Sequence, residues 1–356
     1  MSCLEPRSRA LCAPVNLFLN LTSRCNLECV YCSSTAYYGG RHAEVAELTL
    51  DDYRRLAARF DELGVFRIIY TGGEPFVRED FIDIVGLLRP DRRGVTVNTN
   101  GTFVDADAAR RLKALGVRLC AVSLDGADDE TNARTRGKGT LARAVAAIGA
   151  LAAAGVPVAI SCTVTRHNFR RLRPVAVLGR EYGADISFTS VTALGRAAPG
   201  FAELALDAGD RRWLAGELLD MKAGVWEHVA GDFTSFAFDL LPPPAGGGAT
   251  LLPCGAAKEA CAITADGWVL PCNKMPAFRG GNVKSEDIKA VWNSAPLREV
   301  RALEGQPVHM IRECADCRHI PHCSGGCRAE AYLATGSLYG RTPSCYAYSK
   351  AGGEKD

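Results

Sequence analysis

The stretch TSRCNLECVYC, residues 22–32, brings together the thiols of Cys25, Cys29 and Cys32. It directly follows an apolar run, residues 15–21, which has the length and composition of a buried β-strand. Loops at the carboxyl ends of strands carry the chemistry of α/β folds. Thiolates are the usual ligands of iron–sulfur clusters, so this short loop could bind three irons of one four-iron cube. The fourth iron would stay open to a ligand that is not protein, as catalysis requires.

Two other interpretations of these cysteines are a zinc site and unrelated buried thiols. Zinc sites favour paired C-x2-C units and four ligands, and nothing near this loop supplies a fourth ligand, so iron is favoured. The spacing C-x3-C-x2-C, with Tyr31 before the last cysteine, resembles the signature of the radical S-adenosylmethionine (radical SAM) superfamily. The resemblance implies a 4Fe-4S cluster whose open iron chelates the amino and carboxylate groups of SAM. Once reduced, such a cluster cleaves SAM to methionine and a 5′-deoxyadenosyl radical.

The composition is that of a globular protein. The 356 residues are 47% hydrophobic and 23% charged, with a net charge of +2, which points to neither a nucleic-acid nor a membrane partner. No apolar run is long enough for a transmembrane helix, and the first residues lack a secretory signal. Fifteen cysteines would suggest disulfides in a small secreted protein, but here they cluster at metal-ligand spacings. We therefore expect a cytoplasmic, reducing location.

Strands and helices alternate along the first 192 residues, which predicts βαβ units, a parallel sheet and the α/β fold class. After the strand at 15–21, strands are expected at residues 66–70, 95–99, 117–123, 158–164 and 185–192. Helices are expected at residues 50–63, 80–88, 105–115, 140–154 and 169–182. These make about six units, fewer than a closed eight-fold barrel needs. The resemblance to radical SAM cores implies a partial (β/α)6 barrel.

The domain organisation follows from a run of proline and glycine at residues 242–248, which is typical of a linker. The predicted parts are an N-terminal extension (1–13), the barrel (14–200), a mostly helical connector with the linker (201–253), a cysteine-rich domain (254–346) and a tail (347–356). Within the cysteine-rich domain, Asp266-Gly267 predicts a hairpin turn and residues 285–303 predict one helix. With so short an extension, we expect no fused peptide-recognition domain at the N-terminus.

Eight cysteines beyond the linker fit two four-ligand sets, which could hold two closed clusters or, alternatively, two zinc ribbons. Their pattern resembles the SPASM domain, a C-terminal extension of some radical SAM enzymes that carries two auxiliary 4Fe-4S clusters. The resemblance implies interleaved ligand sets. The first set would be Cys254, Cys261, Cys272 and Cys327, and the second Cys314, Cys317, Cys323 and Cys345. Elsewhere, Cys120 and Cys162 lie in apolar strands and are expected to be small core residues.

Polar residues end several predicted strands, where they would face the barrel mouth, and the resemblance implies that they form a SAM pocket. From the residues alone, Gly72 and Gly73 fit a simple strand-to-helix turn equally well. Arg136 alone is weak evidence, because an exposed arginine is usually only a solvated charge. The resemblance implies that Glu74 accepts from the SAM ammonium, Ser123 lies near the ribose, Arg136 pairs with the SAM carboxylate, and Val164 and Asn168 border the adenine. The predicted cofactor-binding residues are Tyr31, Gly72, Gly73, Glu74, Pro75, Asn98, Asn100, Ser123, Asp125, Arg136 and Val164.

In its cysteine pattern, C-x6-C-x10-C over residues 254–272, the chain most resembles peptide maturases of the mycofactocin and pyrroloquinoline quinone type. It implies abstraction of a substrate hydrogen and oxidative modification of a ribosomally made peptide, with an electron leaving through the auxiliary clusters. The possible outcomes are C-C or C-S bond formation, dehydrogenation or decarboxylation. Sulfatase maturases have an aspartate after the third cysteine of the first auxiliary set, where this chain has Asn273, so formylglycine formation is disfavoured.

Two other functions stay open at this stage. One is radical SAM modification of a small molecule, such as a tetrapyrrole or an aminoglycoside; the other is a non-catalytic electron carrier, which an open-iron loop disfavours. Expected partners are an electron donor such as flavodoxin or ferredoxin and, for a peptide substrate, a separate recognition protein. Candidates for a catalytic acid or base, chosen by position only, are Tyr182, Asp185, Arg196 and Lys274.

Overall fold

The computed structural model describes residues 11–36, 45–224, 229–231, 252, 254–317, 319–323 and 325–345. Most of the predicted N-terminal extension, the 242–248 linker and the 347–356 tail lie outside the described residues. In the part that is described, no helix has both the length and the apolar character needed to cross a membrane.

Six parallel strands form the centre of the fold, each paired with the next along the chain. They are β1 (Asn16–Asn20), β2 (Arg67–Thr71), β3 (Gly94–Thr99), β4 (Leu119–Ser123), β5 (Val158–Val164) and β6 (Asp185–Ser190). The sequence prediction of these strands is confirmed to within a few residues at each end. Consecutive order and parallel pairing make the predicted (β/α) barrel core.

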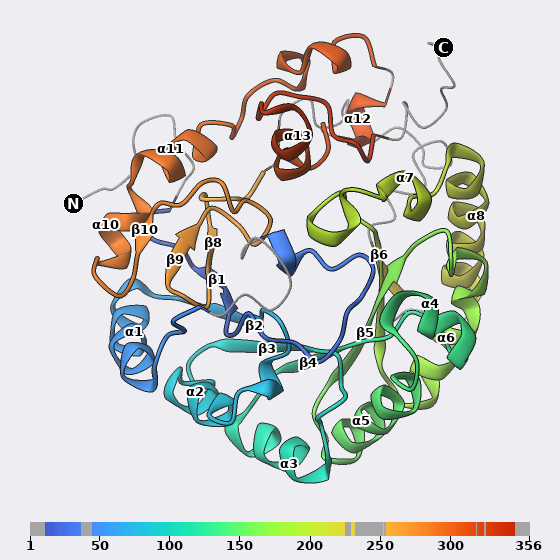
Figure 1. Cartoon of the computed structure of the whole chain (residues 1–356), viewed down its shortest axis with the longest axis horizontal. Coiled ribbons are helices and arrows are strands. Elements are labelled where there is room, and N and C mark those ends of the chain that lie inside the picture. Colours follow the sequence, from blue (N-terminus) through green and yellow to red (C-terminus); the bar gives the residue numbers. More distant parts are fainter. Residues whose placement is uncertain are drawn as a thin grey trace.

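Helices cover the outer face of this curved sheet (Figure 1). They are α1 (Leu50–Leu63), α2 (Phe81–Leu87), α3 (Ala106–Leu115), α4 (Asp129–Arg136), α5 (Leu141–Ala153), α6 (Leu172–Glu181), α7 (Phe201–Leu204) and α8 (Ala208–Gly224). The start of α1 shows why the local sequence is helical there. Thr49 and Asp52 form a reciprocal capping box, and Gly64 ends the helix in the left-handed conformation.

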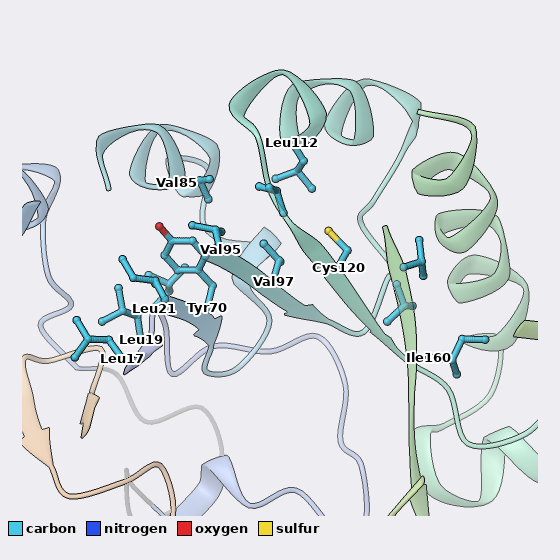
Figure 2. Packing of buried hydrophobic residues seen from close by; sticks show 14 of the residues in the cluster. Leu17, Leu19, Leu21, Tyr70, Val85, Val95, Val97, Leu112, Cys120 and Ile160 are labelled. Atoms are coloured by element: carbon cyan, nitrogen blue, oxygen red, sulfur yellow. The ribbon is translucent and has the colours of Figure 1, made fainter. Parts of the chain in front are cut away.

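The main core fills the layer between the sheet and these helices. Alternate residues of each strand point into it, as Figure 2 shows for Leu17 and Leu19 of β1 and Val95 and Val97 of β3. Tyr70 packs edge-to-face on Phe81 of α2, with ring centroids 5.8 Å apart. The strand residues between these point to the inner, concave face of the sheet. The carboxyl ends of the strands are therefore available for a site. Cys120 and Cys162 belong to this core, so the prediction that they are small core residues is confirmed.

The sheet continues beyond the six strands on both sides, which the sequence did not predict. On one side, β7 (Val229–Gly231) pairs parallel with β6. On the other, β8 (Ala260–Ile263) pairs parallel with β1, and β9 (Trp268–Leu270) and β10 (Gly281–Asn282) follow antiparallel. In the described ranges, β10 and β7 are the two edges of this ten-stranded sheet, so it does not close. The cysteine-rich segment thus begins inside the barrel's own sheet.

The remaining helices belong to the C-terminal segment, and those from residue 295 onward lie at the top of Figure 1. The single helix predicted for residues 285–303 is wrong, because two helices occur there: α10 (Ile288–Trp292) and α11 (Ala295–Arg301). Ser294 is extended between them, and Pro296 lacks the N–H that a continuous helix needs. The chain ends its described part with α12 (Ile320–Cys323) and α13 (Arg328–Thr335). The predicted hairpin turn at Gly267 is confirmed between β8 and β9.

Candidate functional site

One cavity of about 350 Å³ lies at the carboxyl ends of the strands and brings the cysteine loop together with them. The thiol-bearing residues Cys25, Cys29 and Cys32 line it. Residues from the ends of β2 to β6 face them across the cavity, and one residue from the cysteine-rich segment, Lys274, joins them. The residues contributed by the strand ends are Thr71, Gly72, Gly73, Glu74, Asn98, Thr99, Asn100, Ser123, Ser161, Thr163, Thr189, Ser190, Val191 and Thr192.

Close backbone contacts fix the cysteine loop above β2. The N–H of Gly73 donates to the carbonyl of Thr22 at 2.7 Å, and that of Glu74 donates to the carbonyl of Arg24 at 2.9 Å. A Cβ atom on Gly73 would lie 1.9 Å from the Arg24 carbonyl oxygen, and Gly72 has a φ of 129°. Only glycine permits this approach and this backbone conformation. The Gly-Gly pair therefore does more than make a turn.

A second set of contacts holds the far end of the loop. Arg196 donates from Nη1 to the carbonyl of Cys29 at 2.7 Å, and its backbone N–H donates to the carbonyl of Cys32 at 3.0 Å. The amide of Asn100 lies 4.0 Å from the sulfur of Cys25 and donates to the side chain of Asn26 at 2.9 Å. The three thiols are thus presented from a loop that is fixed at both ends.

The three thiols are partly buried and lie beside polar strand ends, a setting that suits a cluster. Burial raises the pKa of Cys25 to about 11, with further contributions from Glu74, Cys29 and Cys32. Burial also raises the pKa of Cys29, partly offset by the charge of Arg136. Thiols with raised pKa values are protonated near neutral pH, so binding of iron there would release protons. Throughout the described ranges, no three His, Cys, Asp or Glu side chains are arranged to hold a single metal ion.

Glu74 places a carboxylate in the same cavity. It accepts hydrogen bonds from the hydroxyl of Thr99 and the backbone N–H of Asn100, both at 2.7 Å, and from the N–H of Phe76 at 3.2 Å. Burial nevertheless raises its pKa to about 7, because these hydrogen bonds offset only part of the desolvation. A buried carboxylate of this kind is suited to accept an ammonium group.

Asp125 organises the opposite wall of the cavity. Its carboxylate forms an ion pair with Arg136, at 2.9 Å from Nε, and accepts from the hydroxyl of Tyr31 and the N–H of Thr163. The Arg136 guanidinium also lies over the Tyr31 ring, 5.5 Å from its centroid. Burial raises the pKa of Tyr31, so this phenol stays protonated as a donor. The structure therefore gives Arg136 an internal partner, although it still lines the cavity.

Among the predicted cofactor-binding residues, Asn98, Asn100 and Ser123 line the cavity. Val164 does not: it packs in the core, because side chains alternate along β5 and Thr163 is the neighbour that faces inward. Asn168 is buried behind the wall, where it donates to the carbonyls of Asp125 and Thr163. Pro75 is buried at the start of the short helix Pro75–Val77. The alternation of side chains along β5 would have identified Thr163 as the residue that faces the cavity.

Of the four acid or base candidates, Lys274 lines the cavity, and its backbone N–H lies 3.4 Å from the sulfur of Cys272. Arg196 supports the cysteine loop and lines a second, larger cavity of about 710 Å³. Asp185 begins β6 and therefore lies at the opposite end of that strand from the site. Tyr182 follows α6 and packs against the core. Neither of the last two is placed to exchange a proton in this cavity.

The C-terminal thiols form two groups. Cys254, Cys272, Cys314 and Cys327 all pack against one core. The first group is Cys254, Cys272 and Cys327: burial raises the pKa of Cys272 to about 12, with contributions from the other two. In the second group, burial raises the pKa of Cys314 to about 11, with contributions from Cys345, Cys323 and Cys317. The four thiols of the second predicted set, Cys314, Cys317, Cys323 and Cys345, therefore lie near one another.

The first predicted set needs a correction at Cys261. This residue lies on β8 and points into the main core between the sheet and the helices, away from Cys254, Cys272 and Cys327. Burial alone raises its pKa, with no contribution from another thiol. The side-chain alternation of β8 is the physical reason. Spacing along the chain does not show which face of a strand a cysteine occupies.

Known proteins agree with this geometry. Residues 19–172 match the Radical SAM superfamily model, and residues 254–318 match the SPASM model, an iron-sulfur cluster-binding domain. The chain is 34% identical over 349 residues to the mycofactocin maturase MftC of Mycobacterium ulcerans, covering 96% of this chain and 90% of that protein. It therefore belongs to the radical SAM superfamily, among the enzymes that carry a SPASM domain. Enzymes of this class use SAM, a SAM-binding 4Fe-4S cluster and auxiliary clusters in the SPASM domain.

Two further similarities define how broad this relationship is. The chain is 28% identical over 350 residues to an AdoMet-dependent heme synthase of Methanosarcina barkeri, covering 94% of this chain and 96% of that protein. The crystal structure of Streptococcus suis SuiB bound to its precursor peptide SuiA superposes with a TM-score of 0.73 and 19% identity, covering 94% of this chain and 76% of SuiB. This structural similarity shows the shared fold of barrel and cysteine-rich extension.

Proposed function

We propose that this radical SAM enzyme is a peptide maturase that oxidatively modifies a ribosomally made peptide. The observation that carries the proposal is the cavity in which three loop thiols face Glu74 and the polar strand ends. When bound there, SAM and its cluster supply a 5′-deoxyadenosyl radical that removes a hydrogen atom from the substrate. Everything else in the reaction is binding, orientation and shielding by the residues of this chain.

Each wall of the cavity has a proposed task. Cys25, Cys29 and Cys32 hold three irons and leave the fourth for SAM. Glu74 accepts the SAM ammonium, because it is the carboxylate that lines this cavity. Asn98, Asn100 and Ser123 offer neutral donors and acceptors to the remaining polar groups of SAM. Arg136 acts mainly as a positioning residue, since Asp125 already pairs with it.

The auxiliary cysteines supply a route for an electron to leave. Removal of a hydrogen atom leaves a substrate radical, and loss of one further electron and a proton completes a two-electron oxidation. Lys274 supports this direction, because it borders the SAM cavity while its backbone contacts Cys272. The electron acceptor and the donor that reduces the SAM cluster would be small redox proteins such as flavodoxin or ferredoxin, in a reducing cytoplasm.

A peptide substrate fits the surroundings of the site. The second cavity, of about 710 Å³, is lined mainly by apolar residues of the loop after β6, the cysteine loop and α13. The two cavities use adjacent residues, such as Ser34 and Thr35 on the cysteine loop and Thr192 and Ala193 after β6. An extended peptide could therefore place one side chain in the SAM cavity and its neighbours in the larger one. The greater identity to a mycofactocin maturase also favours a peptide.

The competing function is modification of a small molecule such as a tetrapyrrole, which the similarity to a heme synthase keeps as the second candidate. Tetrapyrroles carry several carboxylates and need several free cations. The basic residues that line the two cavities are Arg136, Arg196 and Lys274. Arg136 is paired with Asp125, and Arg196 donates to the cysteine loop. The cavities therefore offer Lys274 as their main cation for an anionic group, which suits one carboxylate better than several.

Anaerobic turnover assays would test this proposal. The reconstituted, reduced enzyme would be given SAM and candidate precursor peptides encoded near its gene, and 5′-deoxyadenosine and peptide mass would be followed. We expect peptide-dependent deoxyadenosine and loss of two hydrogens from the peptide, with or without loss of carbon dioxide. A variant with Cys25, Cys29 and Cys32 all changed to Ala is the control. Turnover of coproporphyrin-like tetrapyrroles but of no peptide would overturn the proposal in favour of the second candidate.

A further inference from the structure

Arg328 is a buried basic residue at the start of α13, where the two groups of C-terminal thiols come close in the sequence. Its side chain is 2% exposed. Cys327 of the first group directly precedes it, and Cys323 of the second group lies five positions before it. Among the described residues of the range 254–345, it is the one lysine or arginine that is buried. Because removing a charge from water is costly, a buried cation at this place calls for a compensating partner.

Backbone carbonyls hold the guanidinium of Arg328 in place. Its Nε donates to the carbonyl of Gly326 at 3.2 Å, and its Nη2 donates to that of Gly325. Its Nη1 donates to the carbonyls of Leu338 at 3.1 Å and Gly340 at 2.9 Å. The two glycines lie between the two thiol groups in the sequence, so these contacts fix the guanidinium beside the stretch that joins them. Carbonyls are neutral, and in the described ranges no carboxylate forms an ion pair with Arg328, so its positive charge is not cancelled.

Thiols of both groups lie close enough to respond to this charge. Burial raises the pKa of Cys254 in the first group, and Arg328 opposes the rise. The same holds for Cys314 and Cys323 in the second group. Thiols of both groups also border one apolar core, to which Ala329 of α13 belongs. The guanidinium therefore lies near both groups, in apolar surroundings where a charge acts more strongly than in water.

We propose that Arg328 is the shared counter-charge of the two auxiliary clusters and raises the reduction potential of both. This inference rests on the proposed assignment of the C-terminal thiols to these clusters and on the proposed electron route. Two groups of thiols beside a buried cation fit two anionic clusters, since thiolates give each cluster a net negative charge. An added electron increases that charge, so a fixed cation stabilises the reduced form more than the oxidised form. Both clusters thereby become better acceptors for the electron that leaves the substrate radical.

Redox titration followed by electron paramagnetic resonance tests this role without any substrate. The full-length chain would carry Ala in place of the three loop cysteines, so that only the auxiliary clusters give a signal. In this background, Arg328→Gln should lower the equilibrium constant for one-electron reduction of each cluster about tenfold or more, which is about 59 mV in potential. Arg328→Lys keeps the charge and should stay close to the parent protein. Arg298→Gln removes an exposed charge of α11, which water and salt screen, and should change neither potential.

The lysine variant separates the charge of Arg328 from its hydrogen bonds. Equal shifts in Arg328→Gln and Arg328→Lys would assign the effect to the lost contacts with the carbonyls and overturn the proposal. Unchanged potentials in Arg328→Gln, or a shift of one cluster only, would also overturn it. Iron content covers the case of a folding defect: loss of auxiliary iron in Arg328→Gln alone supports a required charge, whereas equal loss in both variants contradicts it. No result depends on turnover, so failure of the peptide proposal would be seen separately, as a lack of product.

Discussion

At the scale of single residues, the carboxyl group of Glu74 should make the stability of the protein depend on pH. Burial raises its pKa from the ordinary 4.5 to about 7 in the protein without SAM. A carboxyl whose pKa is raised on folding stabilises the fold below its unfolded pKa, and this stabilisation is lost as pH rises through the folded pKa. We expect the free energy of unfolding of the cluster-free protein to fall by up to about 3 kcal/mol between pH 4.5 and pH 8.

Urea unfolding of the cluster-free protein across this range measures that slope. The Glu74→Gln variant should show a much smaller slope, because its side chain does not ionise. SAM should stabilise the cluster-loaded wild type more at pH 8 than at pH 6, since its ammonium favours the ionised carboxylate. Equal slopes in wild type and Glu74→Gln would mean that Glu74 ionises normally and that its burial has no thermodynamic consequence.

Lys274 is the second residue that carries a specific expectation. If it holds a substrate carboxylate, Lys274→Met should lower peptide turnover about 10- to 100-fold, as expected for loss of one charge-assisted contact. Cleavage of SAM without substrate should continue at the wild-type rate, because the cysteine loop and Glu74 are unchanged. The exposed Lys289 of α10 provides the matched control, Lys289→Met. Equal losses of SAM cleavage and peptide turnover in Lys274→Met would place this side chain in SAM binding instead.

Sequence reasoning at the residue scale located residues that line the cavity where motifs mark them, such as Glu74 and Ser123. It failed where the outcome depends on the face of a strand: Val164 is in the core while Thr163 lines the cavity, and Cys261 lies apart from the other thiols. It also missed the pairing of Arg136 with Asp125, which are 11 residues apart and meet only because α4 folds back over the strand end.

At the scale of elements, the contact between the cysteine loop and the end of β2 leaves no space for a side chain. A Cβ on Gly73 would overlap the Arg24 carbonyl, so Gly73→Ala should displace the loop that carries Cys25, Cys29 and Cys32. We expect this variant to lose about four irons and all SAM cleavage while keeping the auxiliary clusters. Gly216→Ala in α8, where an added Cβ meets nothing within 4 Å, is the control. Normal iron content in Gly73→Ala would show that the loop adapts.

The elements themselves were largely predictable where strands and helices follow one another locally. The strands and the helices α1, α2, α3, α5 and α6 could be located because their apolar periodicity and their capping residues are local features of the sequence. The break between α10 and α11 was missed although Pro296 marks it. The pairing of β8 with β1 joins segments more than 200 residues apart, and no local pattern encodes such a contact.

At the scale of the whole molecule, one continuous sheet joins the SAM site to the cysteine-rich segment. β1 leads into the cysteine loop on one side and pairs with β8 on the other. After β9 the chain brings Lys274 to the rim of the cavity, and the backbone N–H of Lys274 lies 3.4 Å from the sulfur of Cys272. The barrel and the cysteine-rich segment are therefore parts of one structural unit, so the auxiliary group lies close to where a substrate radical would form.

The most direct test of this account is iron content together with electron paramagnetic resonance of the anaerobically reconstituted, reduced protein, before and after addition of SAM. We predict about twelve irons per chain and a signal that changes when SAM is added, as expected for three clusters of which one binds SAM. The variant with Cys25, Cys29 and Cys32 changed to Ala should keep about eight irons and show no change with SAM. Zinc in place of iron, or a wild-type signal indifferent to SAM, would contradict the central claim that the cysteine loop holds a SAM-binding cluster.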